Sequence, residues 1–75
     1  MEDGILATKR LALILAREKR GVSKSTVALA TGITPQRYRR IEASIEVKVD
    51  VEEAYKIAVF LGYEHPKEIF LPISV

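Results

Sequence analysis

The 75-residue sequence contains no cysteine and only one histidine. Without cysteine, neither a disulfide framework nor the usual zinc sites can stabilise the chain. His65 stands directly before Pro66 and is interpreted as a surface residue in a turn or cap. No nucleophile or acid–base pair in the sequence has supporting partners. We therefore expect that the protein is not an enzyme and that it binds no metal and no cofactor. A chain this short buries a modest core, so packed helices, with or without dimerisation, must stabilise it.

Long apolar runs are also missing. The most apolar stretch, Ile5 to Ala16, is interrupted by Lys9 and Arg10, which makes it too short and too charged for a membrane span or a signal segment. We therefore expect a soluble, cytoplasmic protein that forms one domain over residues 1–75 and has no membrane partner. A domain of this size leaves no room for a separate ligand-sensing domain, and we expect no small-molecule ligand.

The net charge of +2 hides a difference between the two halves of the chain. Residues 1–42 contain nine Lys and Arg against four acids, whereas residues 43–75 contain three Lys against six acids. A basic first half is what a surface facing phosphate groups requires, because Lys and Arg near a duplex release condensed counterions. Charged residues also solvate ordinary helices, so charge alone leaves both interpretations open.

Helix start and stop signals predict three helices in the basic half. The first is expected from Ile5 to Arg20, where Gly21 ends it. The second follows Ser23, a typical N-cap residue, and ends at Gly32. Its expected inward side chains are Val27, Ala28 and Thr31.

The third helix is expected from Pro35 to Ala43, because Thr34 can cap it and proline is tolerated at the first helical position. Helical spacing places Tyr38 and Ile41 on its buried side. The opposite face holds Gln36, Arg39, Arg40 and Ala43, with Pro35 and Arg37 on its flanks.

The acidic half contains an alternating segment followed by two further helices. Residues 44–49 alternate apolar and charged side chains, which suits an ordered loop or a short strand. Asp50 and Glu53 form a capping-box pattern that opens a fourth helix up to Gly62. Pro66 can open a last short helix to Phe70. The expected inward stripe of the fourth helix is Val51, Ala54, Ile57, Ala58 and Leu61.

The second and third expected helices are short and joined by a turn, which matches the helix-turn-helix arrangement, with its core at about residues 23–43. In that arrangement the second helix of the pair enters the DNA major groove. Gln can pair with adenine through two hydrogen bonds, and Arg can pair with guanine in the same way. Arginines on a surface helix can also be mere solvating charges. That alternative is weakened here because the arginines lie on the helix that the turn pattern selects independently.

Several short segments together carry a resemblance to a known family. They are Arg17, Gly21-Val22-Ser23-Lys24, Val27-Ala28, Thr31-Gly32-Ile33-Thr34, Arg40-Ile41-Glu42, and Lys56-Ile57-Ala58 through Leu61-Gly62. With these segments the sequence resembles the Cro/C1-type (XRE) helix-turn-helix family over nearly its whole length. The resemblance implies an all-α, five-helix, lambda-repressor-like domain that is usually a homodimer on a palindromic operator and acts as a transcriptional repressor or sometimes an activator.

The resemblance also implies roles for individual residues. In the family an arginine late in the first helix pairs with a glutamate at the end of the recognition helix, and these positions are Arg17 and Glu42 here. A partner for Glu42 also makes physical sense, because an unpaired acid on the recognition helix would oppose DNA binding. The expected DNA-binding residues are Lys24, Thr34, Pro35, Gln36, Arg37, Arg39 and Arg40.

Three departures from the family bear on the site. Lys24 stands where relatives usually have a phosphate-binding glutamine, and Pro35 cannot donate a hydrogen bond at the first recognition position. Base reading is therefore expected to shift toward Gln36, Arg37 and Arg40. The common Asn-Gly after the recognition helix is replaced by Ala43-Ser44, and Ile45, Val47 and Val49 can either pack inward or pair as strands across a dimer.

Apolar residues at places where relatives are usually polar, Leu29, Ala30 and Val59, leave two interpretations open. Scattered exposure of such residues is normal. If Val59, Phe60 and the tail from Ile69 to Val75 form one patch, the dimerisation surface lies there, within a tail of residues 63–75. The alternative function is a protein-interaction module or antitoxin of the same fold that acts mainly through a partner protein.

Overall fold

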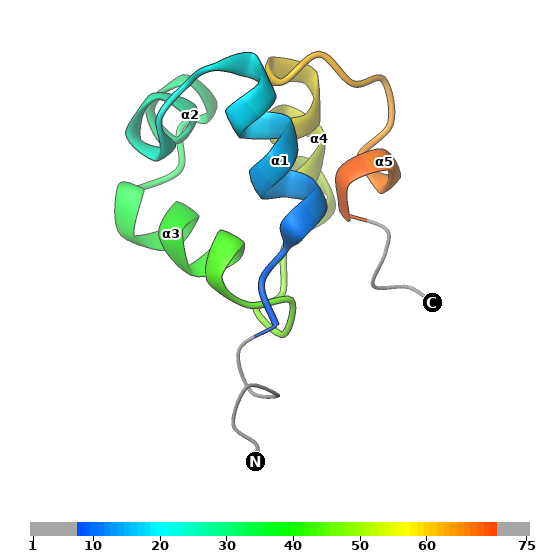
Figure 1. Ribbon diagram of the computed structural model, residues 1–75. Helices are drawn as coiled ribbons and strands as arrows, with labels where there is room; N and C mark the ends of the chain where they lie inside the picture. The colour runs from blue at the N-terminus through cyan, green and yellow to red at the C-terminus, as the bar shows by residue number, and fades with distance from the viewer. Residues whose placement is uncertain (1–7, 71–75) are drawn as a thin grey trace.

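The computed structural model describes residues 8–70, and this part of the chain is helical with no strand. In Figure 1, α2 and α3 lie on one side of α1, α5 lies on the other side, and α4 lies behind α1. α2 packs against α3 and α4, while α1 packs against α3 and α5. The expected all-α, five-helix fold is confirmed. The helices are α1 (Leu11–Arg20), α2 (Lys24–Thr31), α3 (Pro35–Ala43), α4 (Val51–Phe60) and α5 (Lys67–Phe70).

Local hydrogen bonds explain why α2, α3 and α4 begin where the sequence predicts. Ser23 and Thr34 each accept the amide N–H three residues later, at 3.0 and 3.2 Å. Asp50 and Glu53 form the reciprocal capping box, with bonds of 2.9 and 3.2 Å. α2 ends at Gly32, whose φ of 76° lies in the left-handed region that glycine adopts without strain.

The core draws apolar side chains from every helix and includes Val27, Ala28, Tyr38 and Ile41, which were predicted to point inward; Thr31, also predicted inward, is buried beside it as a polar residue. The prediction for Val51 was wrong, because its side chain is 82% exposed. Val51 is the first residue of α4 and precedes Ala54, the first buried residue of that helix. The core cluster consists of Leu13, Ala16, Val27, Ala28, Tyr38, Ile41, Ile57, Ala58, Leu61 and Ile69.

The prediction that the first helix starts at Ile5 was also wrong for the residues that the structure describes. Residues 5–7 lie outside them, and α1 begins only at Leu11. Arg10 has φ −83° and ψ 79°, and its amide donates to the Glu42 carbonyl at 3.0 Å. The carbonyl of Thr8 accepts from the Ile45 amide at 3.0 Å. Hydrogen bonds to the end of α3 and to the loop after it therefore hold this segment out of the helix.

Residues 44–49 form an ordered loop, one of the two conformations expected for them. The Ser44 hydroxyl accepts the amide of Glu46 at 3.0 Å, and Val47 and Val49 are partly buried against the core. The backbone groups of Ile45 bond to residues 8 and 10 of the same chain. They are therefore engaged within the domain instead of forming an open strand edge.

Candidate DNA interface

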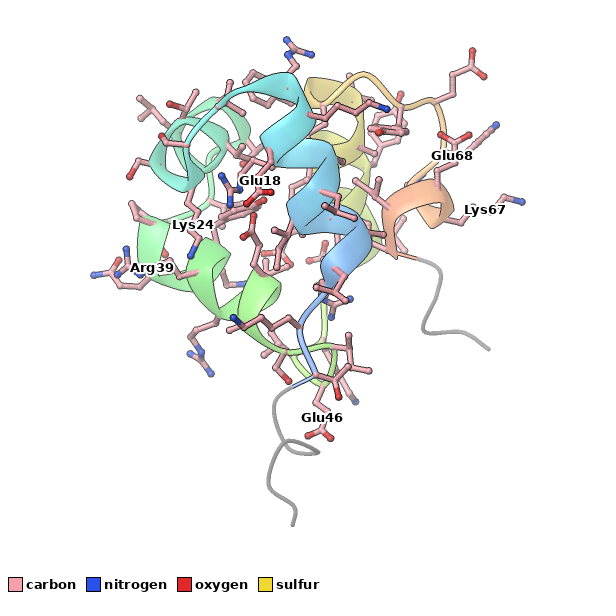
Figure 2. All side chains as sticks on the ribbon, in the orientation of Figure 1. Glu18, Lys24, Arg39, Glu46, Lys67 and Glu68 are labelled. Carbon is pink, nitrogen blue, oxygen red and sulfur yellow. The ribbon has the colours of Figure 1, made fainter. Side chains whose placement is uncertain are left out.

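The exposed face of α3 is the one expected from helical spacing. Tyr38 and Ile41 are fully buried, whereas Gln36, Arg39 and Arg40 are exposed. Pro35 and Ala43, at the two ends of the helix, are exposed as well. Figure 2 shows Lys24, the first residue of α2, and Arg39 on the same side of the molecule, where α2 and α3 meet.

This surface carries positive charge that acids do not offset. Between Gly21 and Ile45 the only acid is Glu42, which is 2% exposed. Within residues 8–70, no hydrogen bond or ion pair engages the side chains of Lys24, Gln36, Arg39 and Arg40. A surface of free cations and one amide can contact both phosphate oxygens and base edges.

Glu42 is held by two donors. Arg17 Nε donates to Glu42 Oε2 at 2.7 Å, Arg17 Nη2 donates to Glu42 Oε1 at 3.4 Å, and Tyr38 Oη donates to Glu42 Oε2 at 2.6 Å. The bond to Glu42 raises the pKa of Arg17. Burial, and then the Glu42 carboxylate, raise the pKa of Tyr38. The ion pair expected from the resemblance is present in the structure, and the tyrosine hydroxyl is an addition that the sequence did not reveal.

Arg17 also joins three parts of the domain. Its Nη1 donates to the carbonyl of Val22 at 3.0 Å, in the turn between α1 and α2. The same guanidinium therefore links α1, that turn and the end of α3. Because its partners are fixed in space, this contact sets the angle at which α3 projects from the domain.

Arg37, one of the expected DNA-binding residues, has partners within the protein. Its guanidinium donates to Glu53 Oε1 at 2.7 Å, to Glu53 Oε2 at 2.9 Å and to the carbonyl of Lys48 at 2.9 Å. This bond from Arg37 lowers the pKa of Glu53. Since all these partners belong to α4 and the loop before it, Arg37 braces α3 against α4. The free side chains on the exposed face are thus Gln36, Arg39 and Arg40.

Thr34 and Pro35 shape the start of α3. The Thr34 hydroxyl is used as the helix cap, and Pro35 occupies the first helical position, where no intrahelical N–H bond is needed. Both residues are exposed, so backbone and ring contacts to DNA remain open to them. Neither presents a side-chain N–H group that could read a base.

Arg10 is a residue at this site that the sequence interpretation missed. It is 7% exposed, and its guanidinium donates to carbonyls at the end of α3 and in the loop that follows. One signal was available in the sequence, because Arg10 precedes buried Leu13 by three residues, a spacing that places both on one helix face. A charged residue in an apolar stripe needs specific partners if it is buried.

A second surface is an apolar groove of about 450 Å³. Two α1 leucines line it, Leu11 at 63% and Leu15 at 62% exposure, together with Ile45 and Phe70. The dimer patch predicted around Val59 and Phe60 has a different environment, since the Arg20 guanidinium lies 5.2 Å from the centre of the Phe60 ring. Residues 71–75 of that predicted patch lie outside the described residues.

Other kinds of site find little support in the described part of the chain. Across residues 8–70, no three His, Cys, Asp or Glu residues are grouped as metal ligands would be. None of the described helices has the length and apolar character needed to cross a membrane. His65 is 62% exposed and lies 4.0 Å from Glu64 Oε1, as expected for a surface residue.

One of the comparisons with known proteins, the one with family models, agrees with this geometry. No curated protein and no solved structure matches the chain significantly. A family model described as helix-turn-helix matches residues 13–67, which include all of α2, α3 and α4. This match covers well over half of the sequence, and the family is one of DNA-binding regulators. The chain therefore belongs to the Cro/C1-type helix-turn-helix family.

Proposed function

We propose that this protein is a sequence-specific transcriptional repressor that binds a palindromic operator as a homodimer. The observation that carries the proposal is the exposed surface of α2 and α3, where cations and an amide lie free and the only acid is buried against Arg17. Occupying DNA that a polymerase must enter is sufficient for repression. The proposal therefore requires no further activity of the chain.

In the proposed complex, α3 lies in the major groove. Gln36, Arg39 and Arg40 face the base edges, and Arg and Gln side chains are suited to read guanine and adenine there. Lys24 and the first turn of α2 lie against a phosphate, where a helix N-terminus and a cation both favour the negative charge. Arg37 and Arg17 hold α3 in place from the protein side.

The proposal predicts that the protein selects one palindromic sequence from a random DNA library. Its affinity for that sequence should fall steeply with salt, because every phosphate contact releases counterions. Between 50 and 200 mM salt we expect a loss of at least about tenfold, measured by fluorescence anisotropy. If no sequence is enriched and binding ignores salt, the proposal is wrong, and the alternative of a module that acts through a partner protein is favoured.

The dimer is proposed to form through the apolar groove between α1, α5 and the loop after α3. Leu11 and Leu15 are large apolar side chains left exposed beside Phe70, and burying them would remove apolar surface from water. Ile45 places this groove directly after the end of α3. A twofold axis there would relate two copies of α3 to each other, and two half-sites about 34 Å apart require such a pair.

For the dimer, we expect Leu15→Glu to lower the mass measured by sedimentation equilibrium from twice 8.4 kDa to 8.4 kDa. A carboxylate placed in the apolar interface would lose its hydration without gaining a partner. Leu29→Glu is the matched control, because Leu29 is a leucine at 85% exposure on α2 and does not line the groove. A wild-type mass of 8.4 kDa at operator-binding concentrations, or a Leu15→Glu dimer, would contradict this interface.

A further inference from the structure

Arg10 is the one cation buried among the described residues, and no carboxylate of residues 8–70 pairs with it. Its guanidinium is instead surrounded by backbone carbonyls. Nε donates to the Ile41 carbonyl at 2.8 Å, and Nη2 donates to the carbonyl of Ile45 at 3.3 Å and to that of Val47. A buried charge is costly unless it is hydrogen-bonded, so these contacts account for its position.

The carbonyls that Arg10 binds belong to the end of the recognition helix. The last four carbonyls of a helix have no partner within it. Arg10 satisfies two of these in α3, since its side chain binds the Ile41 carbonyl and its own amide binds that of Glu42, at 3.0 Å. The positive charge also lies at the negative end of the helix dipole, which is favourable.

α3 has no glycine cap that could satisfy its last carbonyls. α1 and α2 end at Gly21 and Gly32, which adopt the left-handed conformation and bond back to the helix. α3 ends at Ser44, which is extended at φ −153°, and no backbone cap bond follows it. Arg10 therefore substitutes from outside the helix for the cap that the sequence lacks.

The same side chain fixes the loop after α3 and contacts α5. The bonds to Ile45 and Val47 hold the first half of the loop between α3 and α4. On its other side, the Arg10 guanidinium lies 5.5 Å from the centre of the Phe70 ring, which permits a cation–π interaction. One buried group thus connects the end of α3, the loop and α5.

We propose that Arg10 is a positioning residue for DNA recognition, which fixes the C-terminal half of α3 in the major groove through the carbonyls of Ile41, Glu42, Ile45 and Val47. This inference rests on the proposed function. Arg10 is buried and touches no DNA in the proposed complex. Its effect reaches the bases through Arg40, the free cation next to Ile41.

The test replaces Arg10 with Lys, which keeps the charge but lacks the planar fork that reaches several carbonyls at once. We expect faster hydrogen exchange at the Ile45 amide, and at 20 °C a loss of about tenfold in discrimination at the base that Arg40→Ala identifies. Preference at a base read by Gln36, at the start of α3, should stay unchanged. If Arg10 served only overall stability, Arg10→Lys would change neither the preference at the Arg40 base nor that at the Gln36 base, as long as the protein is fully folded.

Arg20→Lys is the matched control, since Arg20 also lies over a phenylalanine ring but is exposed. It should leave exchange and discrimination unchanged. A second variant, Arg10→Met, removes every side-chain bond to these carbonyls and should lose more of the exchange protection at Ile45 than Arg10→Lys does. Wild-type exchange and discrimination in Arg10→Lys would overturn the proposal. Exchange needs no DNA, so it tests the Arg10 contacts separately, whereas wild-type binding tests the proposed function on which the inference rests.

Discussion

Glu42→Ala is expected to destabilise the domain by about 3 to 5 kcal/mol, the cost of removing one partner from a buried ion pair. Native domains are stable by only about 5 to 15 kcal/mol in total. In a domain of this size, we expect the melting temperature to fall by at least about 12 °C. Thermal unfolding followed by circular dichroism measures this directly.

The size of the effect follows from what the substitution leaves behind. Arg17 is 11% exposed in its side chain and would keep its charge without the carboxylate. The Tyr38 hydroxyl is fully buried and would lose its acceptor at 2.6 Å. The Tyr38 hydroxyl therefore remains buried without an acceptor, and Arg17 keeps only the Val22 carbonyl as a partner for its charge. Both losses cost free energy.

Operator affinity should fall in the same variant, although the two contributions have opposite signs. Removing a negative charge near DNA favours binding, but the carboxylate is buried and already neutralised by Arg17. Losing the contact that sets the angle of α3 disfavours binding. We expect the second effect to dominate, and Glu42→Ala to bind the operator more weakly at a temperature where it is folded.

Two controls separate these causes. Glu46→Ala removes an exposed acid from the loop after α3 and should leave the melting temperature unchanged. A triple variant, Arg17→Met with Tyr38→Phe and Glu42→Leu, replaces the whole polar group with apolar side chains and should recover much of the lost stability. A Glu42→Ala protein with wild-type melting temperature and affinity would refute the role assigned to this residue.

The helix starts could be predicted because their causes are local. Ser23, Thr34 and Asp50 each cap a helix through an amide only three residues away. The buried face of α3 follows from the helical period alone. These features depend on residues that are neighbours in the sequence, and sequence patterns report such features well.

The roles of Arg10 and Arg37 could not be predicted in the same way. Arg10 binds carbonyls 31 to 37 residues further along the chain, and Arg37 binds a carboxylate 16 residues away. Such partners are known only once the helices are packed. The same contacts explain why α1 starts later than its pattern suggests, because the backbone at Arg10 is tied to the end of α3. Tertiary hydrogen bonds here overrode a helical pattern.

Arg40→Ala and Lys24→Ala are expected to weaken operator binding in different ways. Arg40 lies free on the exposed face of α3, so its removal should abolish preference at one base pair. A good two-bond contact of this kind contributes about 1 to 3 kcal/mol of discrimination against the wrong base. Lys24, at the start of α2, should contact phosphate, and its removal should weaken binding to every sequence alike.

The measurement is a set of salt titrations on the selected operator and its single-base variants. Lys24→Ala should lower the slope of log K against log salt by about 0.9, the contribution of one phosphate contact. Arg40→Ala should flatten the preference at one position and leave the preferences elsewhere intact.

Lys67→Ala is the matched control, because it removes one exposed lysine from α5, on the side of the molecule opposite to Lys24 and Arg39 (Figure 2). It changes the net charge as much as Lys24→Ala does. If the loss came only from net charge, Lys67→Ala would weaken binding equally. Equal losses on every sequence for Arg40→Ala and Lys24→Ala would show that α3 does not read bases through Arg40. If Arg40→Ala changes the preference at one base and Lys24→Ala changes only the salt slope, then α3 reads bases and α2 binds phosphate. The positions of the free cations on the two helices predict this result.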